Sequence, residues 1–269
     1  MKKSSLTYYI SYILWLLLFV ILPLVLLLLQ ALTNQQGNFT LDNFLNYLSS
    51  GTYLRMTLNS IFYAFLITLI TLIISYPMAY FLTQLKNHQF WMLLVILPTW
   101  INLLLKAYAF IGLLSQNGTI NSTLSFFGIV PYQLLFTNES FLLVSSYIEI
   151  PFMILPIYNS LIEIDSNLIQ ASQDLGANTW QTIKNVIFPL SLNGVRTGIQ
   201  VVFIPSLSLF MITRLIGGNR VITLGTAIEE HFLTTQNWHM GSTIGVVLVI
   251  AMLVTTYFTR EGNKKGRKK

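Results

Sequence analysis

The sequence predicts an all-α membrane protein with about six transmembrane helices, from its composition and its long apolar runs. Of the 269 residues, 54% are hydrophobic and only 9% are charged, whereas a soluble domain carries roughly 25% charged residues. A folded chain of this length cannot hide so much apolar surface from water. The apolar runs are continuous and suit helices of about 20 residues, not the alternating segments of about ten residues in a membrane barrel. A soluble enzyme, a secreted domain and a disordered regulator are therefore excluded.

Six apolar runs are the candidate spans, and we expect them to form a single transmembrane domain over residues 1–269. The runs are 9–32, 57–82, 91–114, 140–162, 191–216 and 240–258. The first begins after three residues that resemble a signal-peptide start, but its apolar run far exceeds the roughly 7–15 residues of a signal h-region. We therefore expect it to remain as a span.

The distribution of lysine and arginine predicts that both termini lie in the cytoplasm. With that orientation, the outer loops hold only Arg55 and Arg220. The inner segments hold Lys2, Lys3, Lys86, Lys184, Arg260, Lys264, Lys265, Arg267, Lys268 and Lys269. The basic tail is expected to rest against anionic lipid headgroups. Because no basic domain exists, the net charge of +6 does not indicate a nucleic-acid partner.

Motifs for catalysis or metal binding are missing from the sequence. There is no cysteine, and His88, His231 and His239 lie far apart without metal-ligand spacing. No phosphate-binding loop or nucleophile elbow occurs, and the nine acidic residues do not cluster. We expect no catalytic residue, no metal site and no cofactor, so that any ATP would be bound by another chain.

The longest inner connection, 164–190, has the pattern of two short helices joined by a glycine turn. Ser166 or Asn167 can cap the first helix. Gly176 stands where a left-handed residue ends it, because glycine has no Cβ penalty there. A second helix can begin two or three residues later, and Pro189 marks the entry to the fifth span.

Two interpretations of this connection remain open from periodicity alone. A short rigid projection can insert into a groove on a soluble partner. Alternatively, an amphipathic connector can lie on the membrane surface.

The spacing of the connection resembles the EAA loop of ABC importer permeases. That motif reads E-A-A, three residues, glycine, nine residues and then I-x-L-P; Ala171, Gly176 and the run 186–189 stand at the matching positions. Gln170 replaces the motif's glutamate and Ser172 replaces an alanine. Losing that charge removes a possible exposed ion pair, which is typically worth about 1 kcal/mol or less. The resemblance therefore implies a functional docking loop with altered contacts.

The resemblance assigns a coupling role toward the ATPase to nine residues. They are Gln170, Ala171, Ser172, Asp174, Leu175, Gly176, Ala177, Trp180 and Pro189.

Other stretches resemble the spermidine/putrescine, or PotB-type, branch of these permeases. They are 97–100, 105–109, 151–158 and 215–218. This resemblance implies a cell-membrane permease with three kinds of partner: a second permease subunit of the PotC type, a cytoplasmic ATPase dimer of the PotA type and an external solute-binding protein of the PotD type. A permease for phosphate, sulfate or iron, or a channel subunit that needs no ATPase, remains an alternative.

Five residues are candidates for the substrate path: Glu149, Trp100, Tyr108, Tyr147 and Tyr158. A carboxylate within a span is costly and usually faces a cavity or a partner, and there it would attract an ammonium group. Aromatic rings can bind cations through their faces. The alternative is structural: Glu149 would pair with Lys106 or Arg196 or stay protonated, and the rings would pack helices or anchor at the interface.

Overall fold

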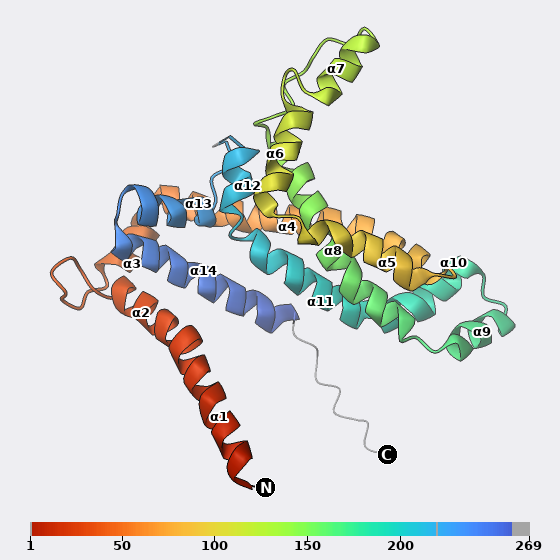
Figure 1. The fold of residues 1–269 in the computed structure, drawn as a ribbon, viewed down its shortest axis with the longest axis horizontal. Helices are drawn as coiled ribbons and strands as arrows, with labels where there is room; N and C mark the ends of the chain where they lie inside the picture. The colour runs from red at the N-terminus through yellow and green to blue at the C-terminus, as the bar shows by residue number, and fades with distance from the viewer. Residues whose placement is uncertain (1, 219, 260–269) are drawn as a thin grey trace.

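The computed structural model describes residues 2–218 and 220–259, and this part of the chain is helical without a β-strand. The all-α class is therefore confirmed. Figure 1 shows the helices in chain order. They are α1 (Lys2–Leu16), α2 (Leu22–Ala31), α3 (Asp42–Ser49), α4 (Gly51–Thr83), α5 (His88–Ile96), α6 (Leu103–Leu114), α7 (Thr119–Phe126), α8 (Asn138–Ile162), α9 (Ser166–Asp174), α10 (Thr179–Thr182), α11 (Phe188–Ser206), α12 (Phe210–Leu215), α13 (Leu224–Glu229) and α14 (Trp238–Thr259).

Five continuous helical segments in the described part are long and apolar enough to cross a membrane. They are Tyr8–Ala31, Gly51–Thr83, Asn138–Ile162, Thr179–Ser206 and Trp238–Thr259. A sixth segment is bent, so the prediction of about six spans agrees with five continuous spans and one bent one. The basic tail beyond Thr259 lies outside the described residues.

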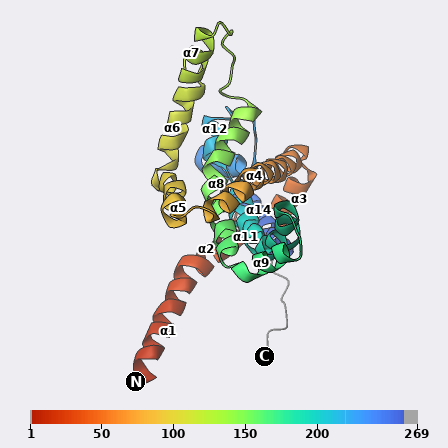
Figure 2. The same cartoon turned by 90° about the vertical axis from the view of Figure 1, so that its right-hand side faces the viewer.

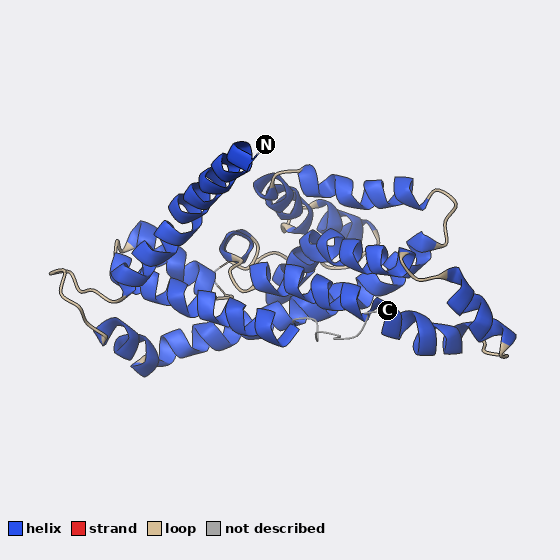
Figure 3. Cartoon of the chain, turned by 90° about the horizontal axis from the view of Figure 1, so that it is seen from below, coloured by secondary structure: helices blue, strands red, loops and turns tan. Residues whose placement is uncertain are grey.

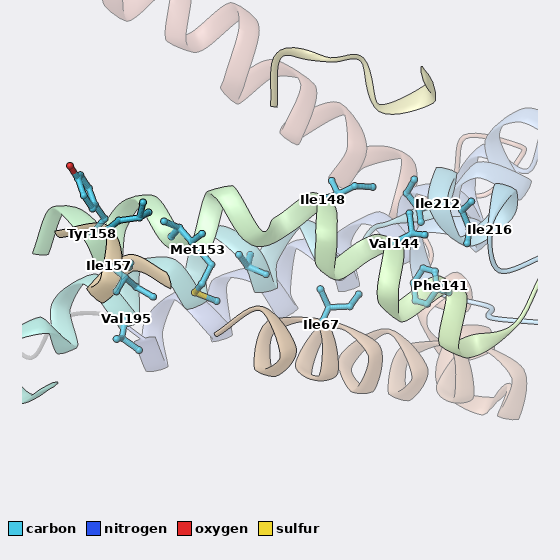
Figure 4. Packing of buried hydrophobic residues seen from close by; sticks show 14 of the residues in the cluster. Ile67, Phe141, Val144, Ile148, Met153, Ile157, Tyr158, Val195, Ile212 and Ile216 are labelled. Atoms are coloured by element: carbon cyan, nitrogen blue, oxygen red, sulfur yellow. The ribbon is translucent and has the colours of Figure 1, made fainter. Parts of the chain in front are cut away.

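The bundle is built around α8, which packs against α4 and α11, while α14 contacts α11 and α2. Ile67 of α4 and Phe141, Val144 and Met153 of α8 are fully or almost fully buried (Figure 4). Figure 3 shows the N-terminal helix projecting away from this bundle. The apolar window of the first span is not buried at all within the chain, so lipid or another subunit must cover it.

Two glycines allow α11 to approach α8 closely. A Cβ on Gly194 would lie 2.5 Å from the Pro156 carbonyl oxygen, and one on Gly198 would lie 2.6 Å from Met153 Sδ. Both contacts are too short for a real side chain. The small residues therefore set the distance between the two helices, as small residues do in membrane bundles.

The predicted third span, 91–114, is not one helix. It bends by 90° between the segments His88–Trp100 and Leu103–Phe126. A 3₁₀ turn containing Pro98 ends the first segment, and the Asn102 side chain caps the second by accepting the Leu104 N–H at 2.8 Å. As a result, α6 and α7 extend away from the bundle (Figure 2).

The predicted fifth span, 191–216, has the wrong boundaries. One continuous helical segment runs over Thr179–Ser206, and α12 is separate from it. Pro189 thus lies inside this segment and not at its entry. The proline has no N–H to donate. The π-helical turn Ile183–Ile187 directly before it changes the hydrogen-bond pattern, so the helix continues without that donor.

Candidate functional site

The first helix of the inner connection, α9, is capped by a residue that the sequence analysis did not select. Asp165 is the N-cap, and its Oδ1 accepts the Asn167 N–H at 2.9 Å. The predicted caps, Ser166 and Asn167, instead occupy the first helical turn. A carboxylate at this position also interacts favourably with the helix dipole.

Gly176 ends α9 in the left-handed conformation, with φ of +84°, as predicted. The Gly176 N–H donates to the Gln173 carbonyl at 2.8 Å, and the Ala177 N–H donates to the Ser172 carbonyl at 3.1 Å. These two bonds form a Schellman ending, which satisfies the last carbonyl groups of the helix. A Cβ at Gly176 would meet nothing within 4 Å, so only the backbone conformation requires glycine.

The second helix begins at a capping box, and a side-chain contact joins it to the first. Asn178 accepts the Gln181 N–H, and Gln181 accepts the Asn178 N–H, both at 2.9 Å. The hydroxyls of Ser172 and Thr182 hydrogen-bond at 3.0 Å. The connection is therefore a defined pair of helices and not a loose loop.

Two large apolar side chains project from this helix pair. Leu175 is 89% exposed and Trp180 is 71% exposed. Most of the predicted coupling residues are exposed with them, namely Gln170, Ala171, Asp174 and Gly176. Ala177 is half-buried, Ser172 faces Thr182, and Pro189 lies apart from them in α11. These exposed side chains are available for contact with a partner, and residues 170–180 are called the docking knob below.

A cavity of about 140 Å³ separates the docking knob from the helices above it. Its lining includes Tyr80 and Gln84 at the end of α4, Leu161 of α8, and Ile169 and Thr182 of the helix pair. Ile169 and Ile183 of the connection nevertheless pack against the buried core of the bundle.

Glu149 is buried in α8, with an exposed fraction of 6%. Lys106 lines a cavity beside this part of α8, together with Tyr147 and Ile148. Within residues 2–218 and 220–259, however, neither Lys106 nor Arg196 forms an ion pair with Glu149, and the ion pair that forms joins Arg214 to Glu229 at 2.7 Å.

The aromatic path candidates do not gather around Glu149. Tyr158 is buried, and its hydroxyl hydrogen-bonds to His88 Nδ1 at 2.6 Å. Tyr147 packs edge-on against Phe110, with ring centroids 5.1 Å apart. The other two, Trp100 and Tyr108, are exposed on the bent segment. Of the four, Tyr147 is nearest to Glu149 along the chain and lines a cavity of about 220 Å³ together with Lys106 and Pro151.

Three buried serines, two in α8 and one at the end of α11, were not selected by the sequence analysis. Ser145, Ser146 and Ser206 are at most 3% exposed, and their hydroxyls have no hydrogen-bond partner. The spacing of Ser145 and Ser146 could have indicated two of them. These residues precede Glu149 by four and three positions, so they share its face of the helix.

The opposite end of the bundle holds a cavity of about 410 Å³, lined in part by Arg214, Glu229 and Glu230. Beside it, His231 Nε2 hydrogen-bonds to the Tyr53 hydroxyl at 2.9 Å. Burial lowers the pKa of His231, and the nearby Glu230 carboxylate opposes that shift.

Solved structures share this fold over most of the chain, although no family model matches the sequence. One is a bacterial ABC transporter for alginate import, with a TM-score of 0.81 and 21% identity, covering 98% of both chains. Another is the MetNI methionine ABC transporter, with a TM-score of 0.59 and 18% identity over 77% of this chain and 92% of that one. The fold is that of an ABC transporter permease subunit.

Curated relatives give the narrower family. The chain is 34% identical over 256 residues to the spermidine/putrescine transport system permease protein PotB of Haemophilus influenzae, covering 91% of this chain and 89% of that protein. PotB of Escherichia coli is 34% identical over 248 residues, covering 88% and 90%. The chain belongs to the PotB family of permeases. It is a multi-pass inner-membrane permease subunit of an ABC importer, which works with a binding protein and an ATPase, and its relatives are named as transport proteins, not enzymes.

Proposed function

We propose that the chain forms part of the path by which an ABC importer takes up the polyamines spermidine and putrescine. The observation that carries this proposal is the 34% identity, over 91% of the chain, to a permease named for spermidine/putrescine transport. The buried carboxylate of Glu149 supports it, because a negative charge inside the bundle offsets the cost of bringing an ammonium group out of water. Tyr147 lines a neighbouring cavity with Lys106 and Pro151 and lies on a different face of α8 from Glu149, since residues two apart on a helix do not share a face.

In this proposal the chain is one permease domain, 1–269, and residues 164–190 couple it to the ATPase. The exposed Leu175 and Trp180 support insertion of the docking knob into a groove of that partner. Asp174 supplies an exposed carboxylate near the position where Gln170 has replaced the motif's glutamate. ATP binding and hydrolysis would then bias a permease with two conformations.

The proposed partners are a second permease subunit of the PotC type, an ATPase dimer of the PotA type and a solute-binding protein of the PotD type. The docking knob faces the cytoplasm in this arrangement, and both termini lie on the same side, as the excess of inner lysine and arginine indicates.

Uptake of labelled spermidine and putrescine tests the proposal in cells that lack their own polyamine uptake and carry this chain with its partner subunits. We expect energy-dependent uptake, and Glu149→Gln should lower its kcat/KM about tenfold or more, because a charge-assisted hydrogen bond is worth about 1.5–3 kcal/mol. Glu163→Gln is the matched control, since that residue is exposed just beyond α8. Uptake of phosphate, sulfate or iron without polyamine uptake would contradict the proposed substrate.

A further inference from the structure

Arg196 is exposed on α11, within a helical segment that can cross the membrane. Asn193 and Thr197 are exposed beside it. Asn193 precedes Arg196 by three residues and Thr197 by four, so the three side chains share one face of the helix. Within residues 2–218 and 220–259, Arg196 forms no ion pair. A cation without a partner is costly in hydrocarbon, so the depth of this face decides what it can contact.

The end of the last span marks the membrane boundary next to this face. Gln200 Nε2 donates to the Thr259 hydroxyl at 2.7 Å, so the end of α14 lies level with Gln200. The sequence is apolar up to this point and basic beyond it. Arg196 precedes Gln200 by four residues and therefore shares the face that contacts α14. It lies one turn past the end of α14, toward the docking knob (Figure 1).

The start of α5 marks the same boundary a second time. The short connection 84–87 joins α4 to α5 and contains Lys86. Lysine in a short connection between two apolar segments indicates the edge of the membrane. His88, the first residue of α5, hydrogen-bonds through Nδ1 to the Tyr158 hydroxyl at 2.6 Å. Helix α5 therefore enters the bundle at the level of Tyr158.

The close packing of α11 on α8 relates this level to Arg196. Gly194 lies against Ile157 of α8, so Tyr158 is level with the turn of α11 around Gly194. The two boundary markers thus lie at residues 194 and 200 of α11, on either side of Arg196. At 1.5 Å per residue they are about 9 Å apart. This depth places Arg196 in the headgroup layer at the edge of the hydrocarbon core.

We propose that Arg196 and the side-chain amide of Asn193 bind the headgroup of an anionic phospholipid in the leaflet next to the docking knob. The guanidinium carries a permanent charge and can donate two parallel hydrogen bonds to phosphate oxygens. The Asn193 amide adds two further donors on the same face. A lipid is favoured over a soluble anion because the face lies at the membrane boundary, where anionic headgroups are concentrated. The site does not depend on which solute is transported.

Titration of phosphatidylglycerol into the assembled transporter in detergent tests this site. The lipid should raise the thermal unfolding midpoint, because a ligand that binds the folded state stabilises it. We expect Arg196→Gln to weaken the apparent affinity for phosphatidylglycerol about fivefold and to leave the midpoint without added lipid unchanged. The matched control is Arg55→Gln, an exposed arginine near the start of α4, which should keep the wild-type affinity. Both variants retain the basic tail, so its contribution to lipid binding is the same.

Three results would overturn the site. Equal affinities of Arg196→Gln and the wild type would mean that the arginine does not bind the lipid. A lower midpoint of Arg196→Gln without added lipid, or loss of the second permease subunit from the complex, would assign Arg196 to a protein partner. The same lowered midpoint in Glu261→Gln, two residues beyond Thr259 in the sequence, would identify that partner as a carboxylate of this chain. Failure of polyamine uptake would leave the lipid site in place.

Discussion

His231 shows how one residue joins distant parts of the chain. It follows α13, and its imidazole bonds to the Tyr53 hydroxyl, which belongs to α4. A second contact, 3.2 Å long, joins its Nδ1 to the Thr235 hydroxyl. The sequence analysis expected no metal role for the three scattered histidines and made no other prediction for them, because the pairing of His231 with Tyr53 spans 178 residues. No local pattern encodes it.

This contact predicts a loss of stability in acid. Burial lowers the pKa of His231 below its usual value of about 6.5. Below about pH 6.5 the unfolded chain therefore takes up a proton more readily than the folded chain, which favours unfolding. We expect the thermal midpoint of the purified protein to fall between pH 7 and pH 5.5, and to fall less in His231→Gln. Equal pH dependence in the two proteins would contradict this assignment.

At the scale of single elements, the inner connection was the best-predicted part of the chain. Gly176 and the start of the second helix could be predicted because glycine and capping residues act locally. The broken third span was missed although Pro98 and Asn102 signal it, because a long apolar run normally indicates one straight helix. The start of the fifth span was also missed. A π-helical turn allowed the helix to continue through Pro189.

Substitutions at two glycines with the same backbone conformation distinguish the cost of local strain from a loss of ATPase docking. Gly176 has φ of +84° and Gly128, between α7 and α8, has φ of +76°, and an added Cβ meets nothing at either position. A non-glycine residue therefore costs about 1–2 kcal/mol at both. We expect Gly176→Asp to abolish ATP-driven uptake with normal membrane insertion, and Gly128→Asp to keep most of the uptake. Similar uptake in the two variants would contradict the proposed docking role of Gly176.

At the scale of the whole molecule, composition and hydropathy could predict the membrane class and most of the helices. They could not predict which faces meet, because apolar side chains surround every span and lipid is as apolar as a neighbouring helix. The close approach of α8 and α11 depends on Gly194 and Gly198. The path candidates therefore lie apart: Glu149 is buried in α8, whereas Trp100 and Tyr108 are exposed on the bent segment.

Assembly with the ATPase should depend on the two apolar side chains of the docking knob. We expect the double variant Leu175→Ser with Trp180→Ala to lose co-purification of the ATPase in detergent, since exposed aromatic anchors commonly contribute 2 kcal/mol or more to an interface. The control is Phe126→Ala, which removes an aromatic side chain of similar exposure from α7. Retention of the ATPase by the double variant, with normal uptake, would place the contact elsewhere.

The continuous helical segment Thr179–Ser206 has a mechanical consequence. At 1.5 Å per residue, its 28 residues span about 42 Å. Trp180 lies at one end and Ser206 at the other, with no break between them. In the coupling proposed above, a movement of Trp180 driven by the ATPase would therefore be carried along one helix into the bundle.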